Sequence, residues 1–389
     1  MKVLGFLYVT LLLFFRAECD SGDLDSIIEE VFRPQRDDNG RNEPFEDFKN
    51  GRDTVQCICV PYYLCQNNTV VTDGTGIIDI RTKQSSCPSY LDVCCEKPLE
   101  DNQRITPAPT VREGCGKRNP EGIGFRITGD EDGEAQFGEF PWMVAVLNEE
   151  VTPERTLNVY QCGGALIHPE VVMTSAHCVS NREKIYKIRA GEWDTQTNNE
   201  LFPHQDAGVR KIIIHPDYNS GALHYDVALL FLDTPLTLAE NIDTVCLPRQ
   251  GEVFDYSRCF ASGWGKDVFA KEGKYQVILK KVELPIVPSR DCELALRGTR
   301  LGPYFNLHHT FVCAGGEVGR DTCKGDGGSP LVCPIRNTKN RFVQVGIVAW
   351  GINCGEKGIP GVYANVAALR DWIDEQLLYN NLSTKYYEF

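Results

Sequence analysis

Residues 321–333 read DTCKGDGGSPLVC, where two cysteines enclose a glycine-rich turn and an apolar run follows it. From Cys115 onward the chain is rich in short β-type runs of this kind, among them FPWMVAVL, DVALLFL and VQVGIVAWG. Turn-forming residues separate these runs, and many short strands with little helix predict an all-β barrel architecture. One helix is expected near the C-terminus, in VAALRDWIDEQLLY, where an apolar stripe consists of Leu369, Trp372, Ile373 and Leu377.

The composition is that of an ordinary globular protein with an acidic balance. The 389 residues are 42% hydrophobic and 24% charged, and the formal net charge is -14. An acidic chain is a poor candidate for non-specific binding to nucleic acid or to anionic membranes. We therefore expect neither of these partners, and the length accommodates one large domain and one small domain.

The N-terminus predicts export from the cell. In residues 1–19, Lys2 precedes an apolar run that is too short to span a bilayer, which is typical of a signal peptide. A buried N-terminal helix is the alternative. Loss of Cys19 with the signal leaves 16 of the 17 cysteines, and an even number favours complete disulfide pairing in an extracellular protein.

Three segments precede the β-rich part. Residues 20–55 are acidic and poor in large apolar groups, which predicts an exposed flexible arm, with a recognition segment as the alternative. Residues 56–96 hold six cysteines in a stretch too short to bury a core, so cross-links must stabilise it. The sequence alone does not establish which of these cysteines pair with one another. Zinc binding by the cysteines is an alternative, but their spacings do not favour it. Residues 97–126 form a linker.

Two positions match the acceptor pattern for N-glycosylation. They are Asn67, in Asn-Asn-Thr, and Asn381, in Asn-Leu-Ser. The second lies in the short C-terminal tail, which we assign to residues 380–389. Each match spans only three residues.

The β-rich part resembles the chymotrypsin-like serine proteases along its whole length. The resemblance rests on MTSAHC, DVALL, CFASGWG, DTCKGDGGSPLVC, and the later WG and GVY. It implies two six-stranded antiparallel barrels with a C-terminal helix over residues 127–379. Residues 56–96 resemble the clip domain of arthropod haemolymph proteases. The whole chain therefore resembles the clip-domain serine protease homologues of insects.

The same resemblance implies a complete set of disulfides. Three pairs belong to the clip domain, namely Cys57–Cys94, Cys59–Cys87 and Cys65–Cys95. Five belong to the protease-like part or tie the linker to it, namely Cys115–Cys246, Cys162–Cys178, Cys259–Cys333, Cys292–Cys313 and Cys323–Cys354. Together they use all 16 cysteines.

The resemblance also assigns the catalytic positions. Serine proteolysis requires a hydroxyl that attacks, an imidazole that takes its proton and a carboxylate that orients the imidazole. His177 stands at the position of the imidazole and Asp226 at that of the carboxylate. The family's nucleophile motif is GDSGGP, and this chain reads GDGGSP, so Gly327 stands at the nucleophile position. We therefore expect a degenerate triad and no enzyme activity.

Ser329 is the nearby hydroxyl that could replace the missing one. It lies two residues further along the chain, and extended chain rises about 3.3 Å per residue. A misplacement of about 1 Å can cost roughly 100-fold in rate. Ser329 is therefore not expected to serve as a nucleophile.

Other site residues follow from the resemblance. Asp321, with Gly351 and Gly361, corresponds to a pocket for a basic side chain, and a relic without a ligand is the alternative. The bond after Arg126 corresponds to the activating cut, after which the amine of Ile127 would pair with Asp326. This match is incomplete, because Thr128 and Asp130 replace the usual residues, so the cleavage candidates are Arg41, Arg104, Arg112 and Arg126.

A loop reading GEWDTQTNNE, residues 191–200, corresponds to the calcium-binding loop of trypsin-like relatives. Glu192, Asp194 and Glu200 supply the hard oxygens that calcium prefers. A solvated acidic loop is the alternative, and no organic cofactor is expected.

The resemblance implies a secreted, non-catalytic cofactor of prophenoloxidase activation and melanisation in the haemolymph. Such a protein would be cleaved by an upstream protease, form homo-oligomers, and bind phenoloxidase and its activating protease through the clip domain. Two alternatives are a weak trypsin-like protease and a pattern-recognition or adhesion protein.

Overall fold

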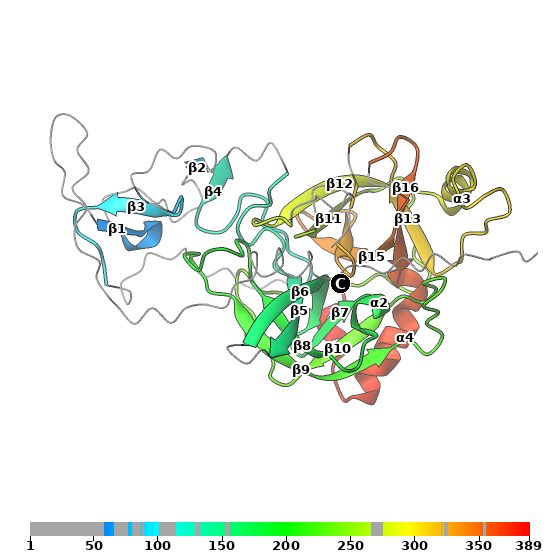
Figure 1. Cartoon of the computed structure of the whole chain (residues 1–389), viewed down its shortest axis with the longest axis horizontal. Coiled ribbons are helices and arrows are strands. Elements are labelled where there is room, and N and C mark those ends of the chain that lie inside the picture. The colour runs from blue at the N-terminus through cyan, green and yellow to red at the C-terminus, as the bar shows by residue number, and fades with distance from the viewer. Residues whose placement is uncertain are drawn as a thin grey trace, which may run out of the picture.

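The computed structural model describes residues 58–65, 77–79, 87, 89–100, 114–128, 133–151, 156–265, 275–319, 321–322, 326–352 and 355–389. Two closed barrels lie side by side in this part of the chain, and the shorter strands of the cysteine-rich segment lie to one side of them (Figure 1). Within the described residues, no helix has both the length and the apolar character needed to cross a membrane.

The first barrel is a closed antiparallel sheet in the order β10-β7-β6-β5-β8-β9. Its strands are β5 (Met143–Val151), β6 (Thr156–His168), β7 (Val171–Thr174), β8 (Ile185–Ala190), β9 (Gln205–Ile214) and β10 (Ala228–Leu232). Every residue of β7 and β10 is buried, whereas β8 alternates between buried and more exposed residues. One face of β8 therefore lines the core and the other meets solvent.

The second barrel has the same construction, in the order β11-β12-β13-β16-β15-β14. Its strands are β11 (Arg258–Gly263), β12 (Lys280–Val287), β13 (Phe311–Gly315), β14 (Pro330–Pro334), β15 (Phe342–Trp350) and β16 (Pro360–Asn365). Closure of each sheet removes the free strand edges that would otherwise attract other chains. The two barrels confirm the all-β, chymotrypsin-like prediction.

Among the described residues, three α-helices accompany the barrels. The C-terminal helix α4 (Val366–Tyr379) spans the predicted residues, and its buried stripe includes Leu369, Ile373 and Leu377. Asn365 caps its first turn by accepting a hydrogen bond from the backbone N–H of Ala368. The sequence prediction missed the short helices α2 (Ala176–Val179) and α3 (Ser289–Arg297), which are too short for a clear apolar stripe.

The residues assigned to the C-terminal tail, 380–389, pack against the first barrel. They include the 3-10 turn η3 (Thr384–Tyr386) and the fully buried Tyr387. The Tyr387 hydroxyl donates to Asp374 at 2.7 Å, and its backbone oxygen accepts from Leu247 N–H at 3.0 Å. The glycosylation candidate Asn381 is exposed just before this segment.

The cysteine-rich segment forms a small antiparallel ribbon of β1 (Ile58–Pro61) and β3 (Asp92–Cys95), with the 3-10 turn η1 (Tyr62–Leu64) after β1. A second pair is parallel and joins β2 (Ile77–Asp79) to β4 (Arg126–Thr128). Because β4 directly precedes the first barrel, this pairing ties the cysteine-rich segment to the protease-like part through the backbone (Figure 1).

An aromatic cluster covers this junction. Tyr62 packs edge-on against Phe125 at 5.0 Å between ring centroids, and Phe125 and Phe137 each pack edge-on against Trp193. Tyr90 meets Trp193 from the side of the cysteine-rich ribbon at 6.4 Å. Edge-to-face pairs of this kind contribute beyond the burial of their area. The small domain is therefore docked on the large one by a buried aromatic core.

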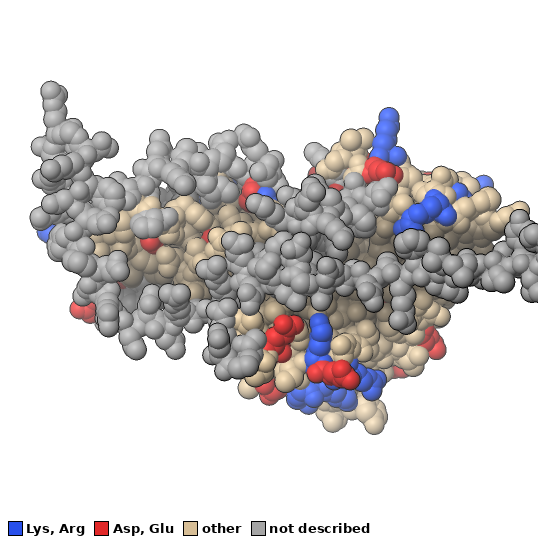
Figure 2. All heavy atoms as spheres, viewed as in Figure 1, with Lys and Arg blue, Asp and Glu red and all other residues tan. Residues whose placement is uncertain are grey.

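Charged side chains of both signs lie next to one another on the face shown in Figure 2. Among the described residues, Arg258 forms ion pairs with Glu283 and Glu317. Exposed pairs of this kind contribute little to stability. The coloured basic residues of this face lie in separate small groups and do not form one broad basic surface.

Candidate functional site

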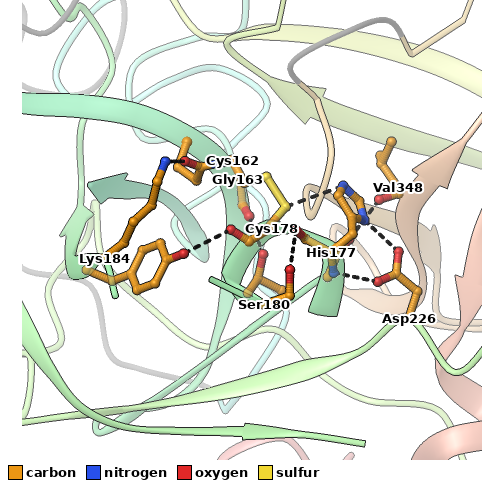
Figure 3. Close-up of a disulfide and its surroundings, with 12 residues drawn as sticks. Cys162, Gly163, His177, Cys178, Ser180, Lys184, Asp226 and Val348 are labelled. Atoms are coloured by element: carbon orange, nitrogen blue, oxygen red, sulfur yellow. Dashed lines mark hydrogen bonds and ion pairs between the residues drawn. A yellow bond between two sulfur atoms is a disulfide. The ribbon is translucent and has the colours of Figure 1, made fainter. Parts of the chain in front are cut away.

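The predicted imidazole and carboxylate meet at the junction of the two barrels. His177 lies in α2, and its Nδ1 is 2.7 Å from Oδ2 of Asp226. The backbone N–H of His177 donates to Oδ1 of the same carboxylate at 2.9 Å. Asp226 is fully buried, whereas the His177 side chain is 30% exposed. The carboxylate thus fixes the ring orientation, and Nε2, the nitrogen that acts as the base in such a triad, lies on the opposite side of the ring, 3.6 Å from Sγ of Cys178 (Figure 3).

Gly327 is the residue that faces this imidazole. A Cβ built on Gly327 would stand 2.9 Å from Nε2 of His177 and 3.6 Å from Sγ of Cys162. The backbone of Gly327 is anchored to the first barrel, because its carbonyl accepts from Gly163 N–H at 3.0 Å. The site therefore has a base at the correct place and no side chain on which that base can act.

The turn that carries this position needs the glycine that follows. Gly328 has a φ of +79°, and a Cβ there would collide with the Thr174 hydroxyl and the Gly163 carbonyl. Only glycine fits such close contact in the left-handed region. The tight turn is thus preserved, although the nucleophile that it would carry is missing.

Ser329 carries the hydroxyl that the sequence places nearest to this position. Its side chain is fully buried, and its Oγ is directed at the backbone of Gly163 and Gly263. A Cβ on Gly263 would lie 3.0 Å from this oxygen, and one on Gly163 would collide with it. A hydroxyl held inside the junction of the barrels cannot reach a substrate that approaches from solvent.

Asp321 and Gly361 come together at the predicted pocket. A Cβ on Gly361 would stand 3.0 Å from Oδ1 of Asp321, so a larger residue would crowd the carboxylate. Backbone N–H groups of Thr322 and Gly355 donate to the two oxygens at 2.8 and 3.2 Å. Burial nevertheless raises the pKa of Asp321 to about 6. No described contact joins Gly351 to Asp321.

This raised pKa predicts how the pocket responds to pH. Benzamidine, a mimic of the arginine side chain, needs an ionised Asp321, and the ionised fraction falls about tenfold between pH 7 and pH 5 if the pKa is about 6. We expect its dissociation constant to rise by a similar factor over this range in isothermal titration calorimetry. Asp321→Asn should abolish benzamidine binding at both pH 7 and pH 5. Binding that is unchanged by this substitution would show that benzamidine binds elsewhere.

The bond after Arg126 is not presented as a cleavage site. Ile127 is 1% exposed and lies in β4, paired with β2. The Gln136 side chain holds both polar groups of Ile127, accepting from its N–H at 2.7 Å and donating to its carbonyl at 3.0 Å. The predicted partner Asp326 instead accepts from Gly265 N–H at 2.9 Å. The pairing of Ile127 with Asp326 is therefore absent from this uncleaved chain.

A trypsin-like protease should consequently leave the Arg126–Ile127 bond intact in the folded protein. A protease binds its substrate as an extended exposed segment, and this one is already hydrogen-bonded in a sheet. N-terminal sequencing of fragments from limited digestion should yield no chain that begins Ile-Thr-Gly-Asp. Gln136→Ala, which removes both contacts, is expected to expose the bond, and rapid cutting of the unmodified protein at this bond would contradict the prediction.

The predicted calcium loop contacts the small domain. Asp194 accepts a 2.5 Å hydrogen bond from the Tyr90 hydroxyl, and Asn199 donates to Asp92 at 3.0 Å. The Asp194 carboxylate also accepts from the backbone N–H of Gln196 at 3.0 Å. Asp194 therefore serves the junction between the two domains, a role that the sequence did not indicate.

The other two acidic residues of this loop are also buried. Glu192 and Glu200 are buried close to each other, and burial raises the pKa of Glu192 to about 7 and that of Glu200 to about 9. Glu192 has Arg189 at 3.3 Å and His204 at 3.4 Å as neighbours. Buried carboxylate oxygens are the ligands that calcium prefers. Calcium at Glu192, Asp194 and Glu200 stays a prediction.

Six disulfides occur among the described residues, and all are pairs that the resemblance implied. They are Cys59–Cys87, Cys65–Cys95, Cys115–Cys246, Cys162–Cys178, Cys259–Cys333 and Cys292–Cys313. Several other expectations lie outside the described residues: residues 1–19 and 20–55, Cys57, Asn67, Arg41, Arg104, Arg112, Cys323 and Cys354.

Comparison with known proteins agrees with this geometry. The trypsin family matches residues 131–373, and the serine protease Clip domain of the PPAF-2 type matches residues 46–96. Phenoloxidase-activating factor 2 of Galleria mellonella is 56% identical over 75% of this chain and 99% of its own length. Two proteins of Anopheles gambiae are also similar. Inactive CLIP domain-containing serine protease A8 is 38% identical over 81% of this chain and 87% of its own length. Inactive CLIP domain-containing serine protease A28 is 37% identical over 82% of this chain and 88% of its own length. The chain therefore belongs to the trypsin family, and within it to the clip-domain serine protease homologues.

Proposed function

We propose that this protein is a secreted, non-catalytic cofactor of prophenoloxidase activation. The observation that carries the proposal is the pairing of His177 and Asp226 in front of Gly327, which preserves the frame of a protease site without its nucleophile. Loss of the nucleophile from a triad costs about a million-fold in kcat in a subtilisin. What the fold retains is a large surface with a docked small domain, which suits binding to other proteins.

The relatives support this role. One is named a phenoloxidase-activating factor, and two others are named inactive. By this proposal an upstream serine protease cuts the chain, the cut protein forms homo-oligomers, and the clip domain binds phenoloxidase. The partners are phenoloxidase, its activating protease and the upstream protease. The haemolymph is the proposed location, and the disulfides are in keeping with an oxidising compartment.

Reconstitution tests the cofactor role directly. Purified phenoloxidase precursor and its activating protease are mixed with this protein or without it, and the oxidation of a catechol is followed by absorbance. We expect phenoloxidase activity only when the cleaved protein is present. Gly327→Ala, which also lacks a hydroxyl, should support the same activity as the unmodified chain. Full phenoloxidase activity without this protein would refute the proposal.

Two other functions make different predictions. A weak trypsin-like protease would be labelled by an active-site organophosphate, and the buried position of Ser329 argues against labelling. A pattern-recognition or adhesion protein would bind cell-wall polysaccharide in a pull-down without phenoloxidase. Polysaccharide binding together with no effect in the reconstitution would favour that alternative.

A further inference from the structure

A disulfide borders the position where the hydroxyl is missing. Cys162 in β6 is bonded to Cys178 in α2, beside His177 (Figure 3). A Cβ on Gly327 would be 2.9 Å from His177 Nε2 and 3.6 Å from Cys162 Sγ. The same Nε2 lies 3.6 Å from Cys178 Sγ. Because Gly327 has no side chain, this position is open. A small molecule there would be within reach of both the imidazole and the disulfide.

This disulfide is also less deeply buried than the other described disulfides of the protease-like domain. Cys162 is 5% exposed, whereas every other described cysteine from Cys115 onward is at most 2% exposed. The His177 side chain beside it is 30% exposed. The oxidised sulfurs are not the thiolates that metal ions bind, although Cys162, His177 and Cys178 place their ligand atoms within 4.8 Å of one another. The arrangement combines a base with an electrophilic sulfur.

We propose that the His177–Asp226 pair promotes exchange between a low-molecular-weight thiol and the Cys162–Cys178 disulfide. His177 Nε2 takes the proton of the incoming thiol, and the resulting thiolate attacks Sγ of Cys162. The Cys162–Cys178 bond breaks, a mixed disulfide forms on Cys162, and Cys178 leaves as a thiolate that receives the proton from the imidazolium. A second thiol then attacks the mixed disulfide, which releases the oxidised thiol dimer and the Cys162 thiol.

The physical reason is that only the thiolate attacks a disulfide. At neutral pH a free thiol is mostly protonated, so a base held beside the disulfide raises the local concentration of the attacking thiolate. The imidazolium formed in this step remains paired with Asp226 and stands 3.6 Å from the departing sulfur of Cys178. One ring therefore serves both the attack and the departure, as a general base and then a general acid.

The test uses the full-length oxidised protein with reduced glutathione at pH 7. Samples are quenched by alkylation at intervals, and mass spectrometry follows the appearance of alkylated Cys162 and Cys178. The deeply buried Cys292–Cys313 pair is the internal control and should stay oxidised. We expect His177→Ala to open the Cys162–Cys178 bond about 100-fold more slowly, the low end of what a positioned base contributes.

A purely structural role for the ring predicts the opposite result. Removal of a side chain that covers the disulfide would expose it and speed its opening. An unchanged or faster rate in His177→Ala, with Cys292–Cys313 still oxidised, would therefore overturn the proposal. Gly327→Ser, which places a side chain over the approach, should also slow the opening, and an undiminished rate in this variant would contradict the geometry.

The pH profile supplies a test that needs no variant. Below the pKa of the thiol, the concentration of free thiolate rises about tenfold per pH unit. Opening that depends on free thiolate alone would follow this slope, as the rate in His177→Ala should. In the unmodified protein the base generates the thiolate in place, so the rate should rise less steeply between pH 6 and pH 8, the range we would scan. Equal slopes would refute the proposal, and the cofactor role would stand unaffected.

Discussion

Gly327→Ser is expected to give the protein a measurable esterase activity. The substitution places a hydroxyl beside Nε2 of His177, which Asp226 already orients at 2.7 Å. The backbone of Gly327 is not among those with positive φ, so serine fits its conformation once the imidazole moves by a few tenths of an ångström. Hydrolysis of an activated arginyl ester should rise by at least about 100-fold, the lower range of what general-base catalysis contributes. Burst kinetics of the ester would measure it.

The controls separate the new nucleophile from contaminating protease. The double variant Gly327→Ser with His177→Ala should lose the gain, because the hydroxyl then has no base. Ser329→Ala in the unmodified chain should change nothing, since that hydroxyl is buried at the junction of the barrels. If Gly327→Ser gains no activity and no organophosphate label while it remains folded, the imidazole is not positioned for proton transfer as described.

Trp193→Ala is expected to produce the largest loss of stability. Trp193 is 1% exposed and packs against Phe125 of the linker, Phe137 of the large domain and Tyr90 of the small one. Its indole N–H also donates to the Ala135 carbonyl at 2.8 Å. Truncation of a buried tryptophan costs about 3–5 kcal/mol. Chemical denaturation should show this loss, and limited proteolysis should show earlier release of the cysteine-rich segment.

Tyr304→Ala is the matched control for this substitution. Tyr304 is also a large aromatic residue, but it is 92% exposed. Exposed substitutions of this kind usually change stability by less than about 0.5 kcal/mol. Equal losses in the two variants would indicate that the junction does not depend on the buried aromatic cluster.

The fold was predictable because its signals are local. Each barrel strand is a short β-type run, and the terminal helix has a stripe of Leu369, Ile373 and Leu377 at helical spacing. The positions of His177 and Asp226 followed from motifs that lie 49 residues apart and meet in space. The missing nucleophile was visible at once, since a single position decides it.

The junction between the domains was not predictable, because its contacts are distant in the sequence. Tyr90 and Asp194 are separated by 104 residues, and no motif connects them. The pairing of β2 with β4 could likewise not be predicted, because three-residue strands are too short to show the alternation of apolar and polar residues that marks a strand. Arg126 was a reasonable cleavage candidate until β4 and Gln136 placed Ile127 in a sheet. The contact of Asp194 with Tyr90 could not be foreseen either, because the tyrosine comes from the other domain.

The parallel pairing of β2 with β4 has a consequence for a chain that has been nicked. A single peptide bond broken between residues 100 and 114 would leave two polypeptides with no disulfide among the described residues to join them. The ladder, the tyrosine–aspartate contact and the aromatic core would still hold the pieces together. Processing would thus convert one polypeptide into a two-piece molecule that migrates as two bands under denaturing conditions and sediments as one particle under native ones.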